Sequence, residues 1–262
     1  MFLTRFLSAA VGIPLLLLAV WHGGWVHLLL TILIMILGLF ELSRLFGRMD
    51  LNPSLAAMTA GVLILSAGVY LGGVAQLGPA VTLVVLLLLI SGVLRYPAVK
   101  PGGVAAGLAG TLYVGLFIYF YLIRTLEDGL AWVLIMLAAT WASDTAAYLV
   151  GKKLGRHKLA PGLSPGKTVE GALAGVAGSI LGACLANFYF PVSAYPVVAA
   201  LGLLAGVAGI LGDLFESSLK RSAGLKDTGG IIPGHGGVLD RFDSMLFTAP
   251  ATYFFITVFV NG

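Results

Sequence analysis

The sequence predicts an all-α, polytopic integral membrane protein, a helical bundle of about nine transmembrane helices. Of its 262 residues, 59% are hydrophobic and only 10% are charged, and the mean hydropathy is +1.03. These values lie outside the range of soluble globular domains. The apolar runs approach the length of about 20 residues that crosses a bilayer as a helix. They lack the alternation of barrel strands, which leaves helices as the spanning element.

Nine apolar windows follow one another along the chain. The first continues through Pro14 to Trp21 without a small-residue cleavage site, so we expect a span there and no cleaved signal peptide. The seventh and eighth windows repeat glycine at steps of three or four, which suits close packing inside one chain and equally a homodimer. The windows cover residues 6–23, 25–43, 54–72, 76–94, 103–123, 129–150, 169–189, 195–216 and 244–260.

The basic residues predict the orientation. With nine spans, 14 of the 15 Lys and Arg residues fall in connections on one side, and only Arg124 falls on the other. The positive-inside rule then places the N-terminus in the cytoplasm and the C-terminus outside. Eight or ten spans would scatter these charges over both sides.

Polarity divides the chain into two functional regions. Residues 1–139 carry 10 charged residues, nearly all near span ends, and are predicted to be scaffold. Residues 140–243 carry 16, so we expect a catalytic region at 140–262 with cytoplasmic loops 151–168 and 217–243. Asp144 lies inside an apolar window, where an ionisable group marks function. The alternative is a structural aspartate that is hydrogen-bonded to a neighbouring helix.

The loop 151–171 holds five basic residues and two Pro-Gly pairs, Pro161-Gly162 and Pro165-Gly166, both predicted to be turns. Its charge suits anionic lipid headgroups. Ser164, Lys167 and Thr168 stand where the next helix is expected to begin, and a helix N-terminus with a lysine and hydroxyls also suits an anion. Both interpretations stay open.

The end of the eighth window carries two acids with different predicted roles. Asp213 lies in the last apolar turns and is expected to face the bundle interior. Glu216 precedes Lys220 by four residues, a spacing typical of a surface ion pair.

Residues 226–244 read KDTGGIIPGHGGVLDRFDS. Asp240 and Asp243 are three residues apart at the start of the last window, and carboxylates suit Mg²⁺ with substrate phosphates. Glycines let backbone amides approach an anion. This combination indicates metal-assisted phosphoryl or nucleotidyl transfer, with helix capping by Asp240 as the alternative. The glycines are 229, 230, 234, 236 and 237, and the neighbouring basic residues are Lys220, Arg221, Lys226 and Arg241.

The stretch 217–244, SSLKRSAGLKDTGGIIPGHGGVLDRFDS, resembles the signature of the CDP-diacylglycerol synthase (phosphatidate cytidylyltransferase) family. SDTAAYLVGKKLGR and LSPGKTVEG resemble further motifs of that family, so the resemblance covers residues 140–245. It implies Mg²⁺-dependent transfer of CMP from CTP to phosphatidic acid, giving CDP-diacylglycerol and pyrophosphate for phospholipid biosynthesis. Cytosolic CTP requires an active site facing the cytoplasm, in agreement with the charge distribution. Without a targeting segment in the sequence, we expect a plasma (inner) membrane enzyme, and no nucleic-acid partner.

The resemblance further implies a two-cation centre with K⁺ as the candidate second ion. Asp213 and Asp240 would be the metal carboxylates, Asp243 a ligand or their support, and Asp144 would line the same cavity. For His235, on chemical grounds, we expect a role in fixing the glycine loop, with proton donation to the leaving pyrophosphate as the alternative. The groups expected to bind the triphosphate and the lipid phosphate are Lys167, Ser164, Thr168, Lys220, Arg221, Lys226, Arg241, Gly236 and Gly237.

Two other classes of protein fit the residues without the resemblance. A secondary transporter would use Asp144 and Asp213 to couple ions, but it predicts inverted repeats and polarity at the midplane. A membrane phosphotransferase of the dolichol-kinase type would share the chemistry. A purely structural membrane protein fits least, because the spans contain acids.

Overall fold

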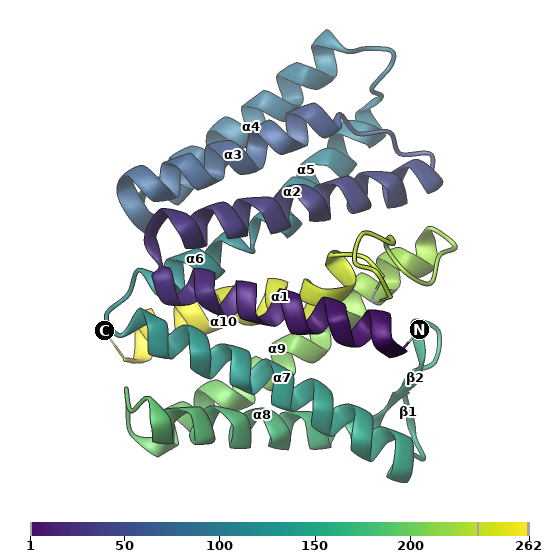
Figure 1. The fold of residues 1–262 in the computed structure, drawn as a ribbon. Helices are drawn as coiled ribbons and strands as arrows, with labels where there is room; N and C mark the ends of the chain where they lie inside the picture. The colour runs from purple at the N-terminus through teal and green to yellow at the C-terminus, as the bar shows by residue number, and fades with distance from the viewer. Residues whose placement is uncertain (1, 235, 261–262) are drawn as a thin grey trace. The chain divides into compact units, whose positions relative to one another are not determined.

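The computed structural model describes residues 2–234 and 236–260, with side chains from residue 8 onward. These residues form an all-α polytopic membrane protein, as predicted, with one short β-hairpin (Figure 1). The helices are α1 (Phe2–His22), α2 (Gly24–Arg48), α3 (Leu55–Gly72), α4 (Leu77–Leu94), α5 (Pro101–Gly115), α6 (Ile118–Arg124), α7 (Gly129–Leu154), α8 (Val169–Tyr189), α9 (Tyr195–Ser222) and α10 (Leu239–Phe259).

Seven segments among the described residues are long and apolar enough to cross a membrane. One of them, Leu55–Leu94, contains two helices, α3 and α4, joined by the 3-10 turn Gly73–Gln76. Ser8–His22 is a shorter apolar helix. Every predicted window overlaps one or two of these helices, and the count of nine spans stays a prediction.

The chain forms two compact units. Unit 1 comprises Met1–Leu122 and Leu219–Arg241, and unit 2 comprises Ile123–Ser218 and Phe242–Gly262. The borders between the units fall inside α6, α9 and α10. The charges predict a different division, into a scaffold before residue 140 and a catalytic region after it. That division concerns function, and it stays a prediction.

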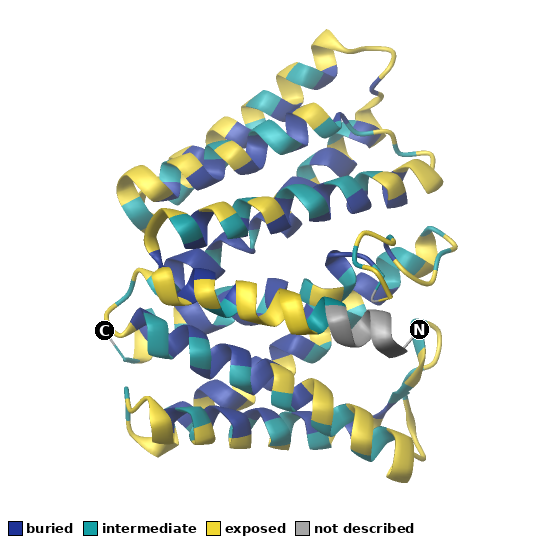
Figure 2. Cartoon of the chain, viewed as in Figure 1, coloured by how far each residue is buried: buried dark blue, intermediate teal, exposed yellow. Residues whose placement is uncertain are grey.

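Unit 1 is built around α2, whose buried side includes Met35, Leu39 and Leu42. Glycines bring the helices of this unit close together: a Cβ on Gly110 of α5 would come within 3.0 Å of the Leu42 side chain. The window 103–123 forms two helices, because α5 ends at Gly115 and α6 begins at Ile118. Large apolar side chains of α1 are exposed (Figure 2), as expected for contact with lipid.

In unit 2, α7 and α8 run side by side (Figure 1) and pack through small residues. A Cβ on Gly178 would lie 2.8 Å from the Ala142 carbonyl oxygen, and one on Gly182 would lie 2.6 Å from that of Ala138. Backbones approach this closely only where side chains are small. In the eighth window Gly202 and Gly206 face the backbone of α8 in the same way. The close packing inside one chain that the glycine spacing predicts is therefore found in both windows.

The connection between α7 and α8 is an antiparallel hairpin of β1 (Lys158–Ala160) and β2 (Ser164–Thr168). Pro161-Gly162 lies in its turn as predicted, but the predicted turn at Pro165-Gly166 is wrong, because that pair lies within β2. The Pro165 carbonyl accepts a hydrogen bond of 2.8 Å from Lys158 Nζ. In a two-stranded sheet both strands are edges, where a proline is tolerated.

Candidate active site

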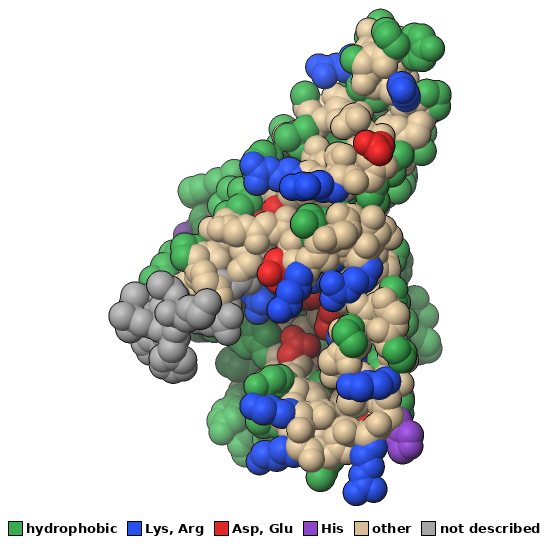
Figure 3. All heavy atoms as spheres, turned by 90° about the vertical axis from the view of Figure 1, so that its right-hand side faces the viewer, with side chains coloured by type: hydrophobic (Ala, Val, Ile, Leu, Met, Phe, Trp, Pro, Cys, Tyr) green, Lys and Arg blue, Asp and Glu red, His purple; other side chains and the backbone are tan. Residues whose placement is uncertain are grey.

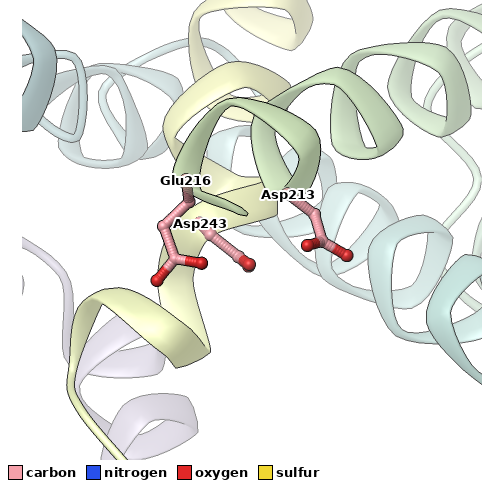
Figure 4. A group of neighbouring side chains, drawn as sticks. All are labelled: Asp213, Glu216 and Asp243. Carbon is pink, nitrogen blue, oxygen red and sulfur yellow. The ribbon is translucent and has the colours of Figure 1, made fainter. Parts of the chain in front are cut away.

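Three carboxylates meet in unit 2. Asp213 and Glu216 project from α9 and Asp243 projects from α10 toward the same region (Figure 4). One carboxylate oxygen from each residue lies within 4.8 Å of one from each of the others. Residues three apart share one face of a helix, which places both acids of α9 toward α10. We call Asp213, Glu216 and Asp243 the acidic trio.

A close approach of two helices brings the acidic trio together. A Cβ on Gly212 would lie 2.6 Å from the Asp243 carbonyl oxygen, so the first turns of α10 rest directly on the α9 backbone. The neighbouring Gly209 faces Ser244 and Thr248 at ordinary contact distance. Ser217 Oγ donates to Asp213 Oδ1 at 3.4 Å and restricts that carboxylate.

A lysine lies against the acidic trio. Lys167 Nζ is 2.5 Å from Asp213 Oδ2, and the two side chains are 23% and 35% exposed. Lys167 comes from β2, and the next residue, Thr168, caps α8 by accepting a hydrogen bond of 3.1 Å from Gly171 N. The hairpin and the start of α8 therefore position this ammonium group. Three acids with one lysine leave a local excess of negative charge when all are ionised.

Oxygen ligands crowded in this way suit a hard divalent cation such as Mg²⁺, which takes carboxylate oxygens and phosphates. Glu216 is fully buried, so the prediction that it lies at the surface is wrong. A glutamate four residues before a lysine has the same spacing whether it is exposed or buried, so the spacing alone does not predict its burial. The sequence signal available for Glu216 was its separation of three residues from Asp213, which indicates a shared helical face.

Asp240 organises a second polar cluster, in unit 1. Its Oδ1 accepts from Lys220 Nζ at 2.7 Å, and its Oδ2 accepts from Thr228 N at 2.9 Å, Thr228 Oγ1 at 3.0 Å and Gly237 N at 2.8 Å. Asp240 and Lys220 are 6% and 13% exposed in their side chains. The contact with Gly237 reaches back over the start of α10, as capping side chains do. Asp240 thus secures the loop between α9 and α10.

The glycines of that loop approach carboxylates of the chain itself. A Cβ on Gly236, which has a φ of +86°, would lie 2.9 Å from Asp240 Oδ2. A Cβ on Gly237 would lie 2.0 Å from Thr228 Oγ1 and 2.5 Å from Glu41 Oε2. The glycines were predicted to admit an anion, and in unit 1 the anionic groups beside Gly236 and Gly237 are Asp240 and Glu41. Sequence reasoning missed Glu41, which is a single acid in an apolar helix.

The other predicted site residues lie mostly at the surface. In unit 2, Asp144 is exposed on α7 and Ser164 is half-buried in β2, four residues before the cap of α8. In unit 1, Lys226 and Arg241 are exposed, and Arg221 is exposed with its guanidinium 3.3 Å from the Leu225 carbonyl oxygen. Exposed Lys and Arg side chains of this kind are visible in Figure 3. His235 lies outside the described residues.

The structure thus brings Asp213, Asp243 and Lys167 together in unit 2, and Asp240 together with Lys220, Gly236 and Gly237 in unit 1. Both groups lie within the part of the chain that carries the quoted motifs.

Comparison with known proteins gives a family and named relatives. The model of the cytidylyltransferase family matches residues 3–259. A Staphylococcus haemolyticus protein named phosphatidate cytidylyltransferase is 34% identical over 255 residues, which cover 95% of each chain. A Bacillus subtilis protein of that name is 44% identical over 154 residues, 56% of each chain. A Synechocystis protein of the same name is 50% identical over 131 residues, 50% of this chain and 44% of its own, so this chain spans about half the length of the latter two relatives.

Proposed function

The chain belongs to the cytidylyltransferase family, and on that premise we propose that it transfers CMP from CTP to phosphatidate, giving CDP-diacylglycerol and pyrophosphate. The acidic trio beside Lys167 is the observation that carries the proposal. Its carboxylate oxygens suit a divalent cation and its lysine suits a phosphate oxygen, and a reaction between two phosphate-bearing substrates needs both. The names of the three relatives support the choice of substrates.

The proposed reaction needs no covalent intermediate. A phosphate oxygen of phosphatidate attacks the α-phosphorus of CTP, an O–P bond forms, and the bond from that phosphorus to the bridging oxygen of pyrophosphate breaks. The nucleophile is anionic near neutral pH, since the second pKa of a phosphate monoester is about 6. The barrier therefore comes from bringing two polyanions together in line, which positive groups in fixed positions lower.

The donor set of the acidic trio fits Mg²⁺. Asp213, Glu216 and Asp243 would hold the ion, and K⁺ is our proposal for a second cation. When bound, Mg²⁺ neutralises phosphate charge and aligns the reacting oxygens. Lys167, next to Asp213, would bind a phosphate oxygen as a compact positive charge. Asp240 accepts hydrogen bonds from Lys220, Thr228 and Gly237. A direct role for Asp240 in metal binding stays a prediction.

Exposed basic groups of unit 1, Arg221, Lys226 and Arg241, are proposed to bind phosphate oxygens of the nucleotide. A lipid phosphate lies at the headgroup level while CTP is dissolved in the cytosol. We therefore propose a plasma membrane enzyme with its site at the cytoplasmic face, in agreement with the charge distribution and the bacterial relatives.

Purified protein in detergent, with radiolabelled CTP and phosphatidic acid, tests the function. We expect CDP-diacylglycerol only with Mg²⁺, tested with and without K⁺, and loss of product in Asp213→Asn and Asp243→Asn. Asp240→Asn tests the predicted metal role of that residue in the same assay. Asp128→Asn is the matched control, since Asp128 is an exposed acid outside the site. A folded parent protein that forms no product with any cation would refute the proposal.

A further inference from the structure

Glu41 is a buried acid of α2 whose carboxylate binds the other end of the chain. It is 0% exposed. Its Oε1 accepts from Val238 N at 2.9 Å, and its Oε2 accepts from Leu239 N at 2.9 Å and from Thr228 Oγ1 at 3.0 Å. All of these residues belong to unit 1. Each of these partners is a hydrogen-bond donor, which matches the carboxylate oxygens as acceptors.

Two of the donors are backbone amides at the start of α10. The first N–H groups of a helix lack partners within it, and the helix dipole favours a negative charge there. Glu41 therefore caps α10 from a different helix, almost 200 residues away in the sequence. This contact fixes where α10 begins, immediately before Asp240.

Glycines in the loop between α9 and α10 make room for this carboxylate. The name loop 223–238 refers here to its described residues, 223–234 and 236–238. A Cβ on Gly229 would lie 2.6 Å from Glu41 Oε1, and one on Gly237 would lie 2.5 Å from Glu41 Oε2. Real Cβ atoms do not approach so closely, so these positions require glycine while Glu41 stays in place. The loop is folded around the Glu41 side chain.

Thr228 joins Glu41 to Asp240. Its hydroxyl oxygen lies 3.0 Å from Glu41 Oε2 and 3.0 Å from Asp240 Oδ2, and Asp240 in turn binds Lys220. A hydroxyl has one proton, so Thr228 Oγ1 donates to only one of these two oxygens at a time, and its proton is shared between Glu41 and Asp240. Glu41, Thr228, Asp240 and Lys220 form what we call the loop network.

We propose that Glu41 is a positioning residue for nucleotide binding: it holds the loop 223–238 and the start of α10 in the conformation that presents Lys226 and Arg241 to CTP. This inference rests on the proposed function. It assigns an activity-related role to a residue of the helices predicted to be scaffold. Glu41 acts through the loop and does not itself touch the reacting groups.

Glu41→Gln tests this role, because glutamine keeps the shape but has only one acceptor oxygen and adds donors opposite backbone N–H groups. Hydrogen exchange without substrate is expected to become about tenfold faster in peptides covering 226–239, since hydrogen bonds to a charged group are lost. Exchange in α7 and α8 should stay unchanged. The KM for CTP should rise about tenfold, with a smaller change in kcat.

Matched variants separate positioning from general stability. Thr31→Val removes another buried hydroxyl of α2, which donates to the His27 carbonyl of its own helix, and should keep the parent exchange and KM. Thr228→Val should raise the exchange rate in 226–239 and the KM for CTP, as Glu41→Gln does. Thr228→Ser keeps the hydroxyl and should show the exchange rate and KM of the parent protein.

Folded Glu41→Gln with parent exchange in 226–239, or with a parent KM for CTP, would overturn the inference. If the parent protein itself makes no CDP-diacylglycerol, the proposed function and the nucleotide role built on it fail together. The exchange comparison would then still show by itself whether Glu41 orders the loop, so the two failures are distinguishable.

Discussion

Single residues determine the chemistry that unit 2 can support. Asp213, Glu216 and Asp243 concentrate three acids within 4.8 Å, and Lys167 compensates one of them. Ionised groups in a helical bundle are costly unless they are paired or coordinated. A divalent cation would remove that cost and place two positive charges beside the reacting phosphates.

Glu216→Gln tests the least expected member of the acidic trio. Loss of one carboxylate ligand should lower kcat/KM by more than about tenfold, since even groups that only support metal ligands contribute 10- to 100-fold. The Mg²⁺ concentration that gives half-maximal activity should rise. Titration of activity with Mg²⁺ measures both effects. An unchanged Mg²⁺ requirement would remove Glu216 from the metal site.

Loss of the Lys167 charge should strengthen Mg²⁺ binding, whereas loss of the Glu216 charge should weaken it. In Lys167→Met the positive charge beside Asp213 is lost, so the Mg²⁺ requirement should fall by up to about fivefold, the range for a partly exposed ion pair. The maximal rate should fall because a phosphate-binding group is missing. Lys167→Arg keeps the charge and serves as the control. A higher Mg²⁺ requirement in Lys167→Met would contradict this assignment.

The sequence predicted some site residues better than others for a physical reason. Asp213 was found because an acid inside an apolar window is costly, and Asp243 was found because it lies three residues from Asp240 in a polar motif. The structure places Asp213 and Asp243 together. Glu41 has the same cost, yet it lies near Arg44 and Arg48 and so resembled a charge at a span end. Its three donors come from residues 228, 238 and 239, a separation that no local pattern reveals.

Helices and their contacts set the distances between these residues. Gly212→Ala adds a Cβ at 2.6 Å from the Asp243 carbonyl oxygen, so α10 must shift away from α9. Misplacement by about 1 Å can cost 100-fold in rate, and we expect kcat to fall at least tenfold. Gly209→Ala faces the same helix at 3.4 Å, an ordinary contact, and should stay near parent activity. Equal rates in the two variants would contradict the dependence on this contact.

The pairing of α7 with α8 should dominate the stability of unit 2. Gly178→Ala places a Cβ 2.6 Å from that of Ala146, and overpacking of this kind costs about 1–3 kcal/mol. The apparent melting temperature in detergent should fall by roughly 2–10 °C. Gly78→Ala, in open space on α4, should keep or raise it, because alanine favours helix. Equal melting temperatures would show that this contact relaxes without cost.

The positions of helices and strands could be predicted from the sequence where hydropathy determines them. Apolar windows located all the long helices, since a span must be apolar over its whole length. The β-hairpin at 158–168 was missed, because its pairing depends on the register of Lys158 with Thr168 and on a short polar segment without alternation. The break between α5 and α6 was missed because an apolar run continues across it.

At the scale of the whole molecule, each compact unit is assembled from two separate stretches of the sequence. The loop 223–238 belongs to unit 1 although the residues before and after it in α9 and α10 belong largely to unit 2. Composition along the chain cannot predict this, because contacts between α2 and residues near 240 join segments far apart. Hydropathy predicts that the chain crosses the membrane, and the charges predict in which direction.

The predicted orientation of the chain in the membrane can be tested on α7 alone. This helix has 26 residues and is about 39 Å long at 1.5 Å per residue, which exceeds the hydrocarbon thickness of about 30 Å. Residues beyond its two ends should therefore lie on opposite sides of the membrane. Glu127 is exposed before α7, and Lys153 is exposed in its last turn. The positive-inside rule places Lys153 in the cytoplasm and Glu127 outside.

Cys184 is the only cysteine, so Cys184→Ser gives a background without thiols. In that background, a membrane-impermeant maleimide should label Glu127→Cys in intact cells, and should label Lys153→Cys only after permeabilisation. The reverse pattern would turn the chain over and place its basic loops outside, away from cytosolic CTP, which would contradict the proposed function. Labelling of both positions from one side would contradict the crossing by α7.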